Sequence, residues 1–246
     1  MSERPEPAAQ PPAVTIVTPL FESARFVPGL LANVAAQEFG DFEHLVVDDR
    51  STDGGAELVR AHAARDPRCR LIRMDERGGP ARARDRALAE ARGRFVAFLD
   101  ADDRWLPSKL RLQVEFMRRG GIGFSYHDYR FMSADGTRVG ALVRGPDRLD
   151  FAGLHRHRGV GCSTVMVDRT MAPGLSFSRV RAARASDFER NGPMIMTMLR
   201  PSTVGVDSIA PNSATSAAKR CSKRTPCSGR DCSRPRNRIM ALTLSP

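Results

Sequence analysis

Two aspartates, Asp100 and Asp102, stand one residue apart in the segment LDADD (99–103), directly after an apolar run. Carboxylates this close together on a turn can face one ligand. Such hard oxygen donors suit Mg²⁺ or Mn²⁺, which proteins often share with substrate phosphates. An EF-hand is excluded because the glycine at the sixth loop position and the terminal glutamate are missing. The alternative is a solvated acidic turn before a helix that Pro107 opens, and a D-x-D pair by itself favours that alternative.

The pattern of apolar residues predicts which elements position these aspartates. Short β-branched or aromatic runs that end at proline or aspartate predict buried strands, and apolar side chains at helical spacing predict helices. This alternation of strand and helix is typical of an α/β domain with a largely parallel sheet. Strands are expected at 14–19, 42–47, 70–74 and 95–99, and helices at 26–34 (capped by Ser23), 54–64, 80–91 and from 107 onward.

The ends of the predicted strands share a polar character. Ligands of such sheets bind beyond the carboxyl ends of the strands. Those ends carry Pro19, the pair Asp48-Asp49 and the acidic residues of 100–103. Three strands therefore bring polar or acidic residues to one rim. A structural alternative is that Asp48 and Asp49 only cap the turn before the helix at 54–64, although Asp53 is better placed for that role.

Later segments of the chain show a different pattern. Residues 1–12 are rich in proline, alanine and glutamate and predict a flexible leader. Residues 121–133 and 161–168 predict further strands, so a mixed half follows the parallel one. From about residue 189 no apolar period of either kind remains, and serine, proline and arginine dominate. We therefore expect one domain over 13–188 and a disordered basic tail over 189–246.

The net charge of +11 over 246 residues raises the question of a nucleic-acid partner. Residues 189–246 carry ten of the 39 basic side chains but only three of the 28 acidic ones, so much of the excess lies in the expected tail. Aromatic residues make up 6% of the chain and offer few platforms for base stacking. We expect no nucleic-acid partner for the domain, and the question stays open for the tail alone.

The cysteine spacing and the hydropathy of the sequence argue against a zinc site, a membrane-spanning helix and a secretory signal. The five cysteines form no CxxC pair and match no standard zinc spacing, which favours unpaired thiols in a reducing compartment. No stretch approaches the roughly 20 apolar residues of a membrane-spanning helix. The first residues lack an apolar core of the kind that a secretory signal needs. Spanning and secretion are therefore not expected.

Three blocks of sequence together resemble a known family. VTIVTPLFES (14–23), VVDDRSTDGG (46–55) and GGPARARDRALAEARGRFVAFLDADDRW (78–105) resemble the donor-binding half of family-2 glycosyltransferases in order, spacing and strand placement. The resemblance continues through SYHDYRFMSADGT (125–137) and GVGCSTVMVDR (159–169), and it is closest to members of the teichuronic-acid-biosynthesis type. It implies a GT-A nucleotide-diphospho-sugar transferase fold, Rossmann-like and mostly parallel, with a donor half over 13–120 and an acceptor half over 121–188.

The resemblance also implies roles on the donor side. Thr18 and Pro19, with Glu22 on the following turn, would line the nucleobase and ribose pocket. Asp49 would accept a hydrogen bond from the uracil ring, and Arg84 would approach the diphosphate. Two alternatives remain open: Arg84 as one of many surface arginines, and Glu22 as a first-turn charge that complements a helix dipole.

For the residues 100–103 and for the acceptor side, the resemblance implies a separate role for each carboxylate. Asp100 would contact the ribose or a metal-bound water, Asp102 would ligate a divalent cation directly, and Asp103 would help to hold the turn. Asp187 matches the carboxylate that acts as base towards the acceptor hydroxyl. The implied reaction is a single displacement with inversion at the anomeric carbon.

After residue 188 the chain departs from the family pattern. Ser186 stands where the family has glutamate or glutamine, and Arg190-Asn191-Gly192-Pro193 cannot continue the helix that follows there in the family. We hypothesise that the residues from about 190 onward are read out of frame relative to an ancestral gene. Resequencing the coding DNA tests this, and an alternative frame without a family-like continuation refutes it.

The predicted function is an inverting, metal-dependent glycosyltransferase of hexosyltransferase type. It would use Mn²⁺ or Mg²⁺ and move a sugar from a UDP-sugar to a polysaccharide or lipid-linked acceptor of the cell surface. We expect a cytoplasmic protein, with peripheral association to the inner face of the plasma membrane left open. The alternative is an impaired nucleotide-sugar-binding protein, because the acceptor part is altered. A dinucleotide-dependent oxidoreductase is rejected because residues 19–24, PLFESA, lack the G-x-G-x-x-G motif, and a nucleotidyltransferase is rejected because a glycine-rich basic loop is absent there.

Overall fold

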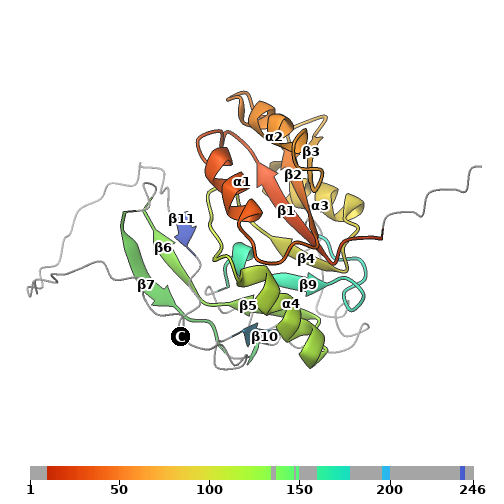
Figure 1. The fold of residues 1–246 in the computed structure, drawn as a ribbon, viewed down its shortest axis with the longest axis vertical. Coiled ribbons are helices and arrows are strands. Elements are labelled where there is room, and N and C mark those ends of the chain that lie inside the picture. Colours follow the sequence, from red (N-terminus) through yellow and green to blue (C-terminus); the bar gives the residue numbers. More distant parts are fainter. Residues whose placement is uncertain are drawn as a thin grey trace, which may run out of the picture.

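The computed structural model describes residues 10–133, 137–146 and 160–177, together with the backbone of three short strands at Arg148–Leu149, Met196–Leu199 and Ile239–Ala241. Strand and helix alternate through the first half (Figure 1): β1 (Val14–Leu20), α1 (Val27–Ala35), β2 (Phe42–Asp48), α2 (Gly55–Ala63), β3 (Cys69–Arg73), α3 (Gly79–Glu90), β4 (Phe95–Phe98) and α4 (Lys109–Gly120). The second half is mostly strand: β5 (Phe124–His127), β6 (Tyr129–Met132), β7 (Val139–Val143), β8 (Arg148–Leu149), the 3-10 helix η1 (Cys162–Thr164), β9 (Met166–Asp168), β10 (Met196–Leu199) and β11 (Ile239–Ala241).

The main sheet has eight strands in the order β3-β2-β1-β4-β9-β5-β10-β8. β1 pairs in parallel with both β2 and β4, and β2 pairs in parallel with β3. The chain therefore adds strands on one side from β1 to β3 and then crosses to the other side of β1 with β4. Open α/β sheets bind ligands at the carboxyl ends of the strands where the order reverses in this way. In this chain that point lies between β1 and β4.

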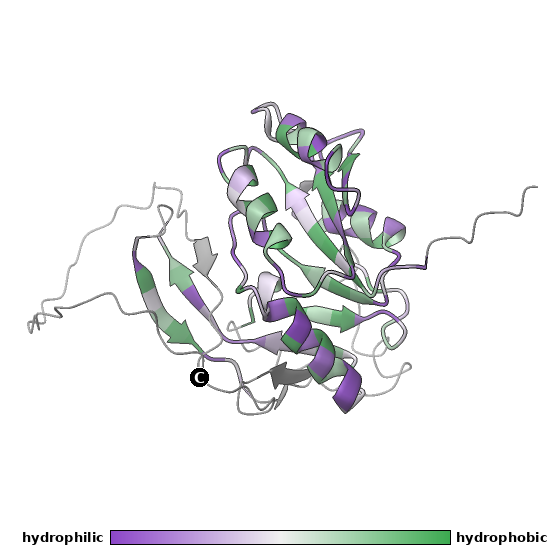
Figure 2. Cartoon of the chain, viewed as in Figure 1, coloured by the Kyte–Doolittle hydropathy of each residue, from purple (hydrophilic) through white to green (hydrophobic). Residues whose placement is uncertain are grey.

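Two apolar clusters cover the two faces of this sheet. One joins Ile16 and Val46 to apolar side chains of α1, α2 and α4, and the other joins Val17 and Val47 to the small apolar side chains of α3. Successive strand residues alternate between the clusters because side chains alternate across a strand. Figure 2 shows the apolar central strands and the polar outer surface of α4. Strands buried on both faces explain the unbroken apolar runs of the sequence.

β9 enters the sheet against the direction of its neighbours. It pairs antiparallel with β4 on one side and with β5 on the other. Because the strands run in opposite directions, the start of β9 lies beside the end of β4. The 3-10 helix η1, which immediately precedes β9, is thereby brought to the carboxyl ends of the parallel strands.

The structure corrects three sequence expectations. Residues 121–133 form two strands in different sheets, because β5 joins the main sheet and β6 joins the three-stranded sheet β11-β6-β7. Residues 161–168 form η1 and β9 rather than one strand. Ser23 does not cap α1: its hydroxyl donates to the carbonyl of Phe21, and the helix begins at Val27 without a side-chain cap.

Two further expectations concern the later part of the chain and its hydropathy. β10 and β11 lie in the range 189–246, for which the sequence predicts no regular structure, and the remainder of that range lies outside the described residues. Among the residues that the structure describes, no helix has both the length and the apolar character needed to cross a bilayer.

Candidate active site

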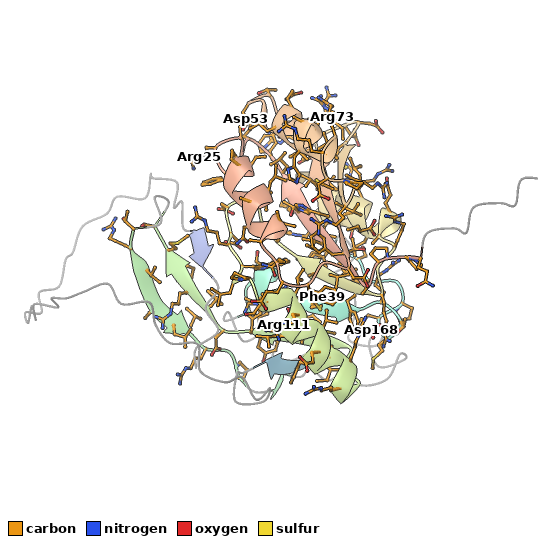
Figure 3. All side chains as sticks on the ribbon, viewed as in Figure 1. Arg25, Phe39, Asp53, Arg73, Arg111 and Asp168 are labelled. Carbon is orange, nitrogen blue, oxygen red and sulfur yellow. The ribbon has the colours of Figure 1, made fainter. Side chains whose placement is uncertain are left out.

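The carboxyl ends of the four parallel strands meet at one rim. Backbone hydrogen bonds continue past the strands themselves, from the N–H of Leu99 to the carbonyl of Val17 (3.0 Å) and from the N–H of Asp49 to the carbonyl of Leu20 (2.8 Å). The N–H of Met74 likewise donates to the carbonyl of Asp48 at 2.9 Å. In Figure 3, Arg25, Asp53 and Arg73 lie at this end of the sheet, whereas Asp168, which pairs with the start of β4, lies at the other. The structure thus brings together the polar strand ends that the sequence predicted to meet.

Residues 100–103, called the acidic loop below, form a turn closed by a hydrogen bond from the N–H of Asp103 to the carbonyl of Asp100 (3.0 Å). Its three carboxylates have different surroundings. Asp100 accepts a hydrogen bond from Nη2 of Arg84 at 2.5 Å, and buried Asp103 accepts one from the hydroxyl of Ser163. Asp102 has no side-chain partner among the described residues, although its side chain is partly buried. The loop therefore presents one carboxylate without a side-chain hydrogen bond from the described residues.

The electrostatics of Asp102 fit a cation site. Burial, with the nearby charge of Asp100 adding to it, raises the pKa of Asp102, while the charge of Arg25 opposes the shift. A carboxylate disfavoured in this way gains from a bound cation. Among the described residues no group of three or more His, Cys, Asp or Glu side chains could hold a metal ion. This suits Mg²⁺ or Mn²⁺ bound by one or two carboxylates and completed by substrate phosphates and water.

Arg84 is a buried partner of this loop rather than a surface arginine. Its side chain is 12% exposed, pairs with Asp100 and lies over the ring of Phe177, 5.2 Å from the centroid. Burial alone would lower the pKa of Arg84, but the charge of Asp100 raises it overall. Among the residues that the structure describes, none is a hydrogen-bond partner of its buried Nε atom. The surface alternative is wrong, and a guanidinium with an unused donor stands beside the acidic loop.

Asp49 connects the end of β2 to the start of α3. It is buried, and its two carboxylate oxygens accept hydrogen bonds from the backbone N–H groups of Gly78 and Gly79, each at 2.7 Å. Gly79 has φ = +78°, a conformation that favours glycine. Each carboxylate oxygen has a further lone pair, so Asp49 keeps acceptor capacity for a ligand. The alternative that Asp48 holds the following turn is supported, since its Oδ1 accepts from the N–H of Ser51 at 3.0 Å.

Thr18 and Pro19, near the end of β1, differ in their burial and contacts. The side chain of Thr18 is buried, and its hydroxyl shares a 2.9 Å hydrogen bond with Nε2 of His44. Burial lowers the pKa of His44 to about 3, so this ring is neutral. Thr18 therefore turns its hydroxyl to the neighbouring strand, whereas Pro19 is only partly buried at the rim. The hydroxyl of Thr18 thus has a partner within the sheet, and the prediction that Thr18 lines the nucleotide pocket stays a prediction.

Glu22 bridges two loops. Its Oε1 accepts hydrogen bonds from the N–H and the hydroxyl of Thr52, at 2.8 and 3.1 Å. Its own N–H donates to Ser51, and its φ of +46° is unusual for a residue with a side chain. Because α1 begins only at Val27, Glu22 is not a first-turn helix charge. It ties the loop after β1 to the loop after β2.

Sequence analysis missed several residues around the loop. Ser163 contacts both Asp100 and Asp103, and Trp105 donates from Nε1 to the carbonyl of Ser163 at 2.8 Å. Phe177 packs edge to face on Phe98 with centroids 4.9 Å apart. Trp105 had a signal in the sequence, as the single tryptophan of the chain, two residues after the last of the acidic residues. The predicted base Asp187 lies outside the described residues.

The chain matches a family model over most of this structure. The model described as "Glycosyl transferase family 2" matches residues 15–162. TuaG of Bacillus subtilis (strain 168), named for teichuronic acid biosynthesis as a glycosyltransferase, is 34% identical over 170 residues, which is 69% of this chain and 68% of that protein. The UDP-Glc:alpha-D-GlcNAc-diphosphoundecaprenol beta-1,3-glucosyltransferase WfgD of Escherichia coli is 34% identical over 164 residues, 67% of this chain and 63% of that protein. The chain thus matches about two thirds of the length of these relatives.

Solved structures show the same fold. TarS 1–349 of S. aureus in complex with UDP-GlcNAc has a TM-score of 0.58 at 21% identity, over 76% of this chain and 55% of that one. The mannosyltransferase PcManGT of Pyrobaculum calidifontis, in complex with GDP-Man and Mn²⁺, has a TM-score of 0.50 at 24% identity, over 75% of this chain and 48% of that one. The expected GT-A architecture and the class of enzyme are confirmed. Since the family model covers more than half of the chain, including Arg84 and the acidic loop, the chain belongs to glycosyl transferase family 2.

Proposed function

We propose that this protein transfers a sugar from a UDP-sugar to a hydroxyl group of a cell-surface polysaccharide or lipid-linked acceptor, with inversion at the anomeric carbon and with the help of Mn²⁺ or Mg²⁺. The observation that carries this proposal is the acidic loop at the point where the strand order reverses. There Asp102, which has no side-chain partner in the described ranges, lies beside the pair of Arg84 and Asp100. Relatives such as WfgD, whose name gives a UDP-sugar donor and a diphospho-lipid acceptor, support the substrate classes.

On the donor side, different described residues would contact the diphosphate, the base and the ribose of the nucleotide. Asp102, with Asp100 next to it, would hold a divalent cation, which when bound supplies positive charge to the diphosphate as the sugar leaves. Arg84, which pairs with Asp100 through Nη2, would place a second positive charge beside the diphosphate. Asp49 would use its remaining lone pairs to accept a hydrogen bond from uracil. Pro19 and Glu22 would border the base and ribose.

On the acceptor side, the proposal assigns the base to Asp187. Its carboxylate would take the proton of the acceptor hydroxyl, whose oxygen attacks the anomeric carbon from the face opposite the diphosphate. The new glycosidic C–O bond forms as the bond to the diphosphate oxygen breaks, so UDP leaves and the configuration inverts. Residues 121–188 would form the acceptor half and 13–120 the donor half. The site would work in the cytoplasm, with peripheral attachment at the membrane that holds a lipid-linked acceptor.

UDP release from a panel of UDP-sugars, measured with Mn²⁺, with Mg²⁺ and with EDTA, tests the proposal. We expect release that requires a divalent cation and falls at least tenfold in Asp102→Asn, which keeps the size of the side chain but removes its charge. Asp41→Asn is the matched control, because Asp41 is exposed and precedes β2 at the other end of the sheet. Release that persists in EDTA, or equal activity of the two variants, contradicts the metal assignment.

The second candidate, a nucleotide-sugar-binding protein without turnover, is favoured by the departure from the family pattern at Ser186 and at Gly192-Pro193. Binding and turnover separate the two. If UDP and Mn²⁺ bind together but no UDP is released from the donor in the presence of extracts containing acceptor, the second candidate holds. Donor-dependent release that disappears in Asp187→Asn supports the enzyme.

A further inference from the structure

Ser163 reaches the acidic loop from a distant part of the chain. It lies in η1, directly before β9, and is fully buried. The antiparallel pairing of β9 with β4 places η1 beside the end of β4, where the acidic loop begins. A backbone hydrogen bond from Phe98 to the carbonyl of Val165 (3.4 Å) continues this pairing towards the loop. The position of Ser163 is therefore a consequence of the sheet topology and not of local sequence.

The hydroxyl of Ser163 holds both ends of the acidic loop. Its oxygen accepts a hydrogen bond from the N–H of Asp100 at 3.0 Å, and its hydrogen is donated to Oδ2 of Asp103. One side chain thus bonds the first and the last residue of the turn. Asp102, which lies between them, is left without a side-chain partner in the described part of the chain.

Trp105, two residues after the loop, is held by the same 3-10 helix. Nε1 of Trp105 donates to the carbonyl of Ser163 at 2.8 Å, and the Trp105 ring is buried. The side chain of Asn33 in α1 makes two hydrogen bonds to the backbone of Trp105: it accepts from the N–H at 2.8 Å and donates to the carbonyl at 2.7 Å. The loop is therefore fixed between α1 and η1, with Ser163 as the shared contact.

We propose that Ser163 is the positioning residue of the acidic loop, fixing the direction in which Asp102 presents its carboxylate to the metal–diphosphate group. This rests on the proposed function, since it concerns the same site. Without the hydroxyl, the buried carboxylate of Asp103 and the N–H of Asp100 would each lose a partner. The turn would relieve this by moving towards water, and Asp102 would move with it. Ser163 does not contact the reacting atoms and acts through the loop.

The test measures Mn²⁺ affinity in the presence of UDP, by the electron paramagnetic resonance signal of free Mn²⁺, for the full chain. We expect Ser163→Ala to weaken binding at least tenfold and Ser163→Thr, which keeps the hydroxyl, to recover most of it. Thr164→Val is the matched control: Thr164 is the buried neighbour in η1, and its hydroxyl donates to Gly161 at 2.7 Å without touching the loop. Its affinity should stay within twofold of the parent.

Trp105 gives a second readout that needs no metal. It is the single tryptophan of the chain, so tryptophan fluorescence reports on the segment just after the acidic loop. We expect a red-shifted emission in Ser163→Ala and an unchanged emission in Thr164→Val. If Ser163→Ala does not fold, Ser163→Cys, with nearly the same volume and a weaker hydrogen-bond donor, takes its place with the same expectations.

Each result bears on the proposal. Parent-like Mn²⁺ affinity in Ser163→Ala overturns the role of Ser163 and leaves the proposed function intact. Equal weakening in Ser163→Ala and Thr164→Val also overturns it, because the loss would then follow general destabilisation of η1. If the parent itself binds no Mn²⁺ with UDP, the proposed metal site fails, and the positioning role fails with it. The double variant Ser163→Ala/Asp103→Ala should lose less affinity than the product of the single losses, since both remove one hydrogen bond.

Discussion

At the scale of single residues, a substitution of Arg84 distinguishes a structural from a functional role most clearly. It is buried, pairs with Asp100, and its Nε–H has no hydrogen-bond partner within the part of the chain that the structure describes. We expect Arg84→Met to weaken UDP binding about tenfold or more, because a charge-assisted hydrogen bond contributes roughly 1.5–3 kcal/mol. Isothermal titration calorimetry with UDP and Mn²⁺ measures this.

The matched control for Arg84 lies on the same helix. Arg86 is 54% exposed and pairs with Glu90 at 2.6 Å, away from the acidic loop. Arg86→Met should bind UDP as the parent does. If the two variants behave alike, Arg84 serves only to neutralise Asp100.

Thr18 tests a role that the resemblance implied but that the geometry does not favour. Because its hydroxyl bonds to buried, neutral His44, we expect Thr18→Val to lower the free energy of unfolding by about 1–3 kcal/mol, the cost of leaving a buried polar group unpaired. UDP affinity should not change. Urea unfolding and calorimetry measure the two effects, and a loss of affinity without a loss of stability would restore Thr18 to the pocket.

The sequence predicted the carboxylates of the site but not their partners. A D-x-D after an apolar run is visible within five residues, and its chemistry follows from residue type. The contact between Asp103 and Ser163 joins residues 60 positions apart, so no local pattern contains it. The pairing of Arg84 with Asp100 was equally hidden, because burial of one arginine among many depends on packing of α3 against the sheet.

At the scale of elements, Glu43 joins three neighbouring segments at the end of the sheet opposite the site. It is buried in β2 and accepts hydrogen bonds from Thr15 of β1 (2.8 Å) and from the backbone and the side chain of Arg92, just before β4 (2.7 and 2.9 Å). Burial would raise the pKa of Glu43, but the hydrogen bonds from Arg92 and Thr15 lower it overall from 4.5.

A carboxylate with a lowered folded pKa stabilises the fold above its unfolded pKa, and the contribution is lost as the pH falls. We therefore expect part of the stability of the chain to disappear below about pH 4.5, and Glu43→Gln to be less stable at pH 7 with a flatter dependence below that pH. Thermal unfolding between pH 3 and 7 measures this. A parallel dependence in parent and variant would contradict it, and Glu57→Gln, on the exposed side of α2, is the control.

The first half of the fold was predictable because its signals are local. Strands buried on both faces give unbroken apolar runs, and the proline in the first turn of α3 predicts the start of that helix. The second half was not, since the break after His127 and the 3-10 turn before β9 depend on which sheet each strand joins. β9 is three residues long, and its antiparallel place between β4 and β5 is set by neighbours that are distant in the sequence.

At the scale of the whole molecule, the charges of the site link nucleotide and metal to stability. Among the described residues there is no cluster of three metal-binding side chains. Under the proposed function, the phosphates of UDP would complete the coordination of a cation at Asp102. UDP brings negative charge to a rim that already carries Asp100 and Asp102, and a cation alone lacks ligands. Each ligand should therefore bind weakly without the other.

This coupling predicts a thermal shift of the full chain that is larger for the pair than for the sum of its parts. Ligands that bind only the folded state at 100 times their Kd stabilise it by about 2.7 kcal/mol, which for a chain of this size raises the Tm on the order of 5–10 °C. UDP or Mn²⁺ alone should give a small part of this shift. Asp102→Asn should abolish the excess, whereas Asp41→Asn should retain it. An additive response in the parent would mean that the two ligands occupy separate sites, and it would remove the cation from the donor pocket.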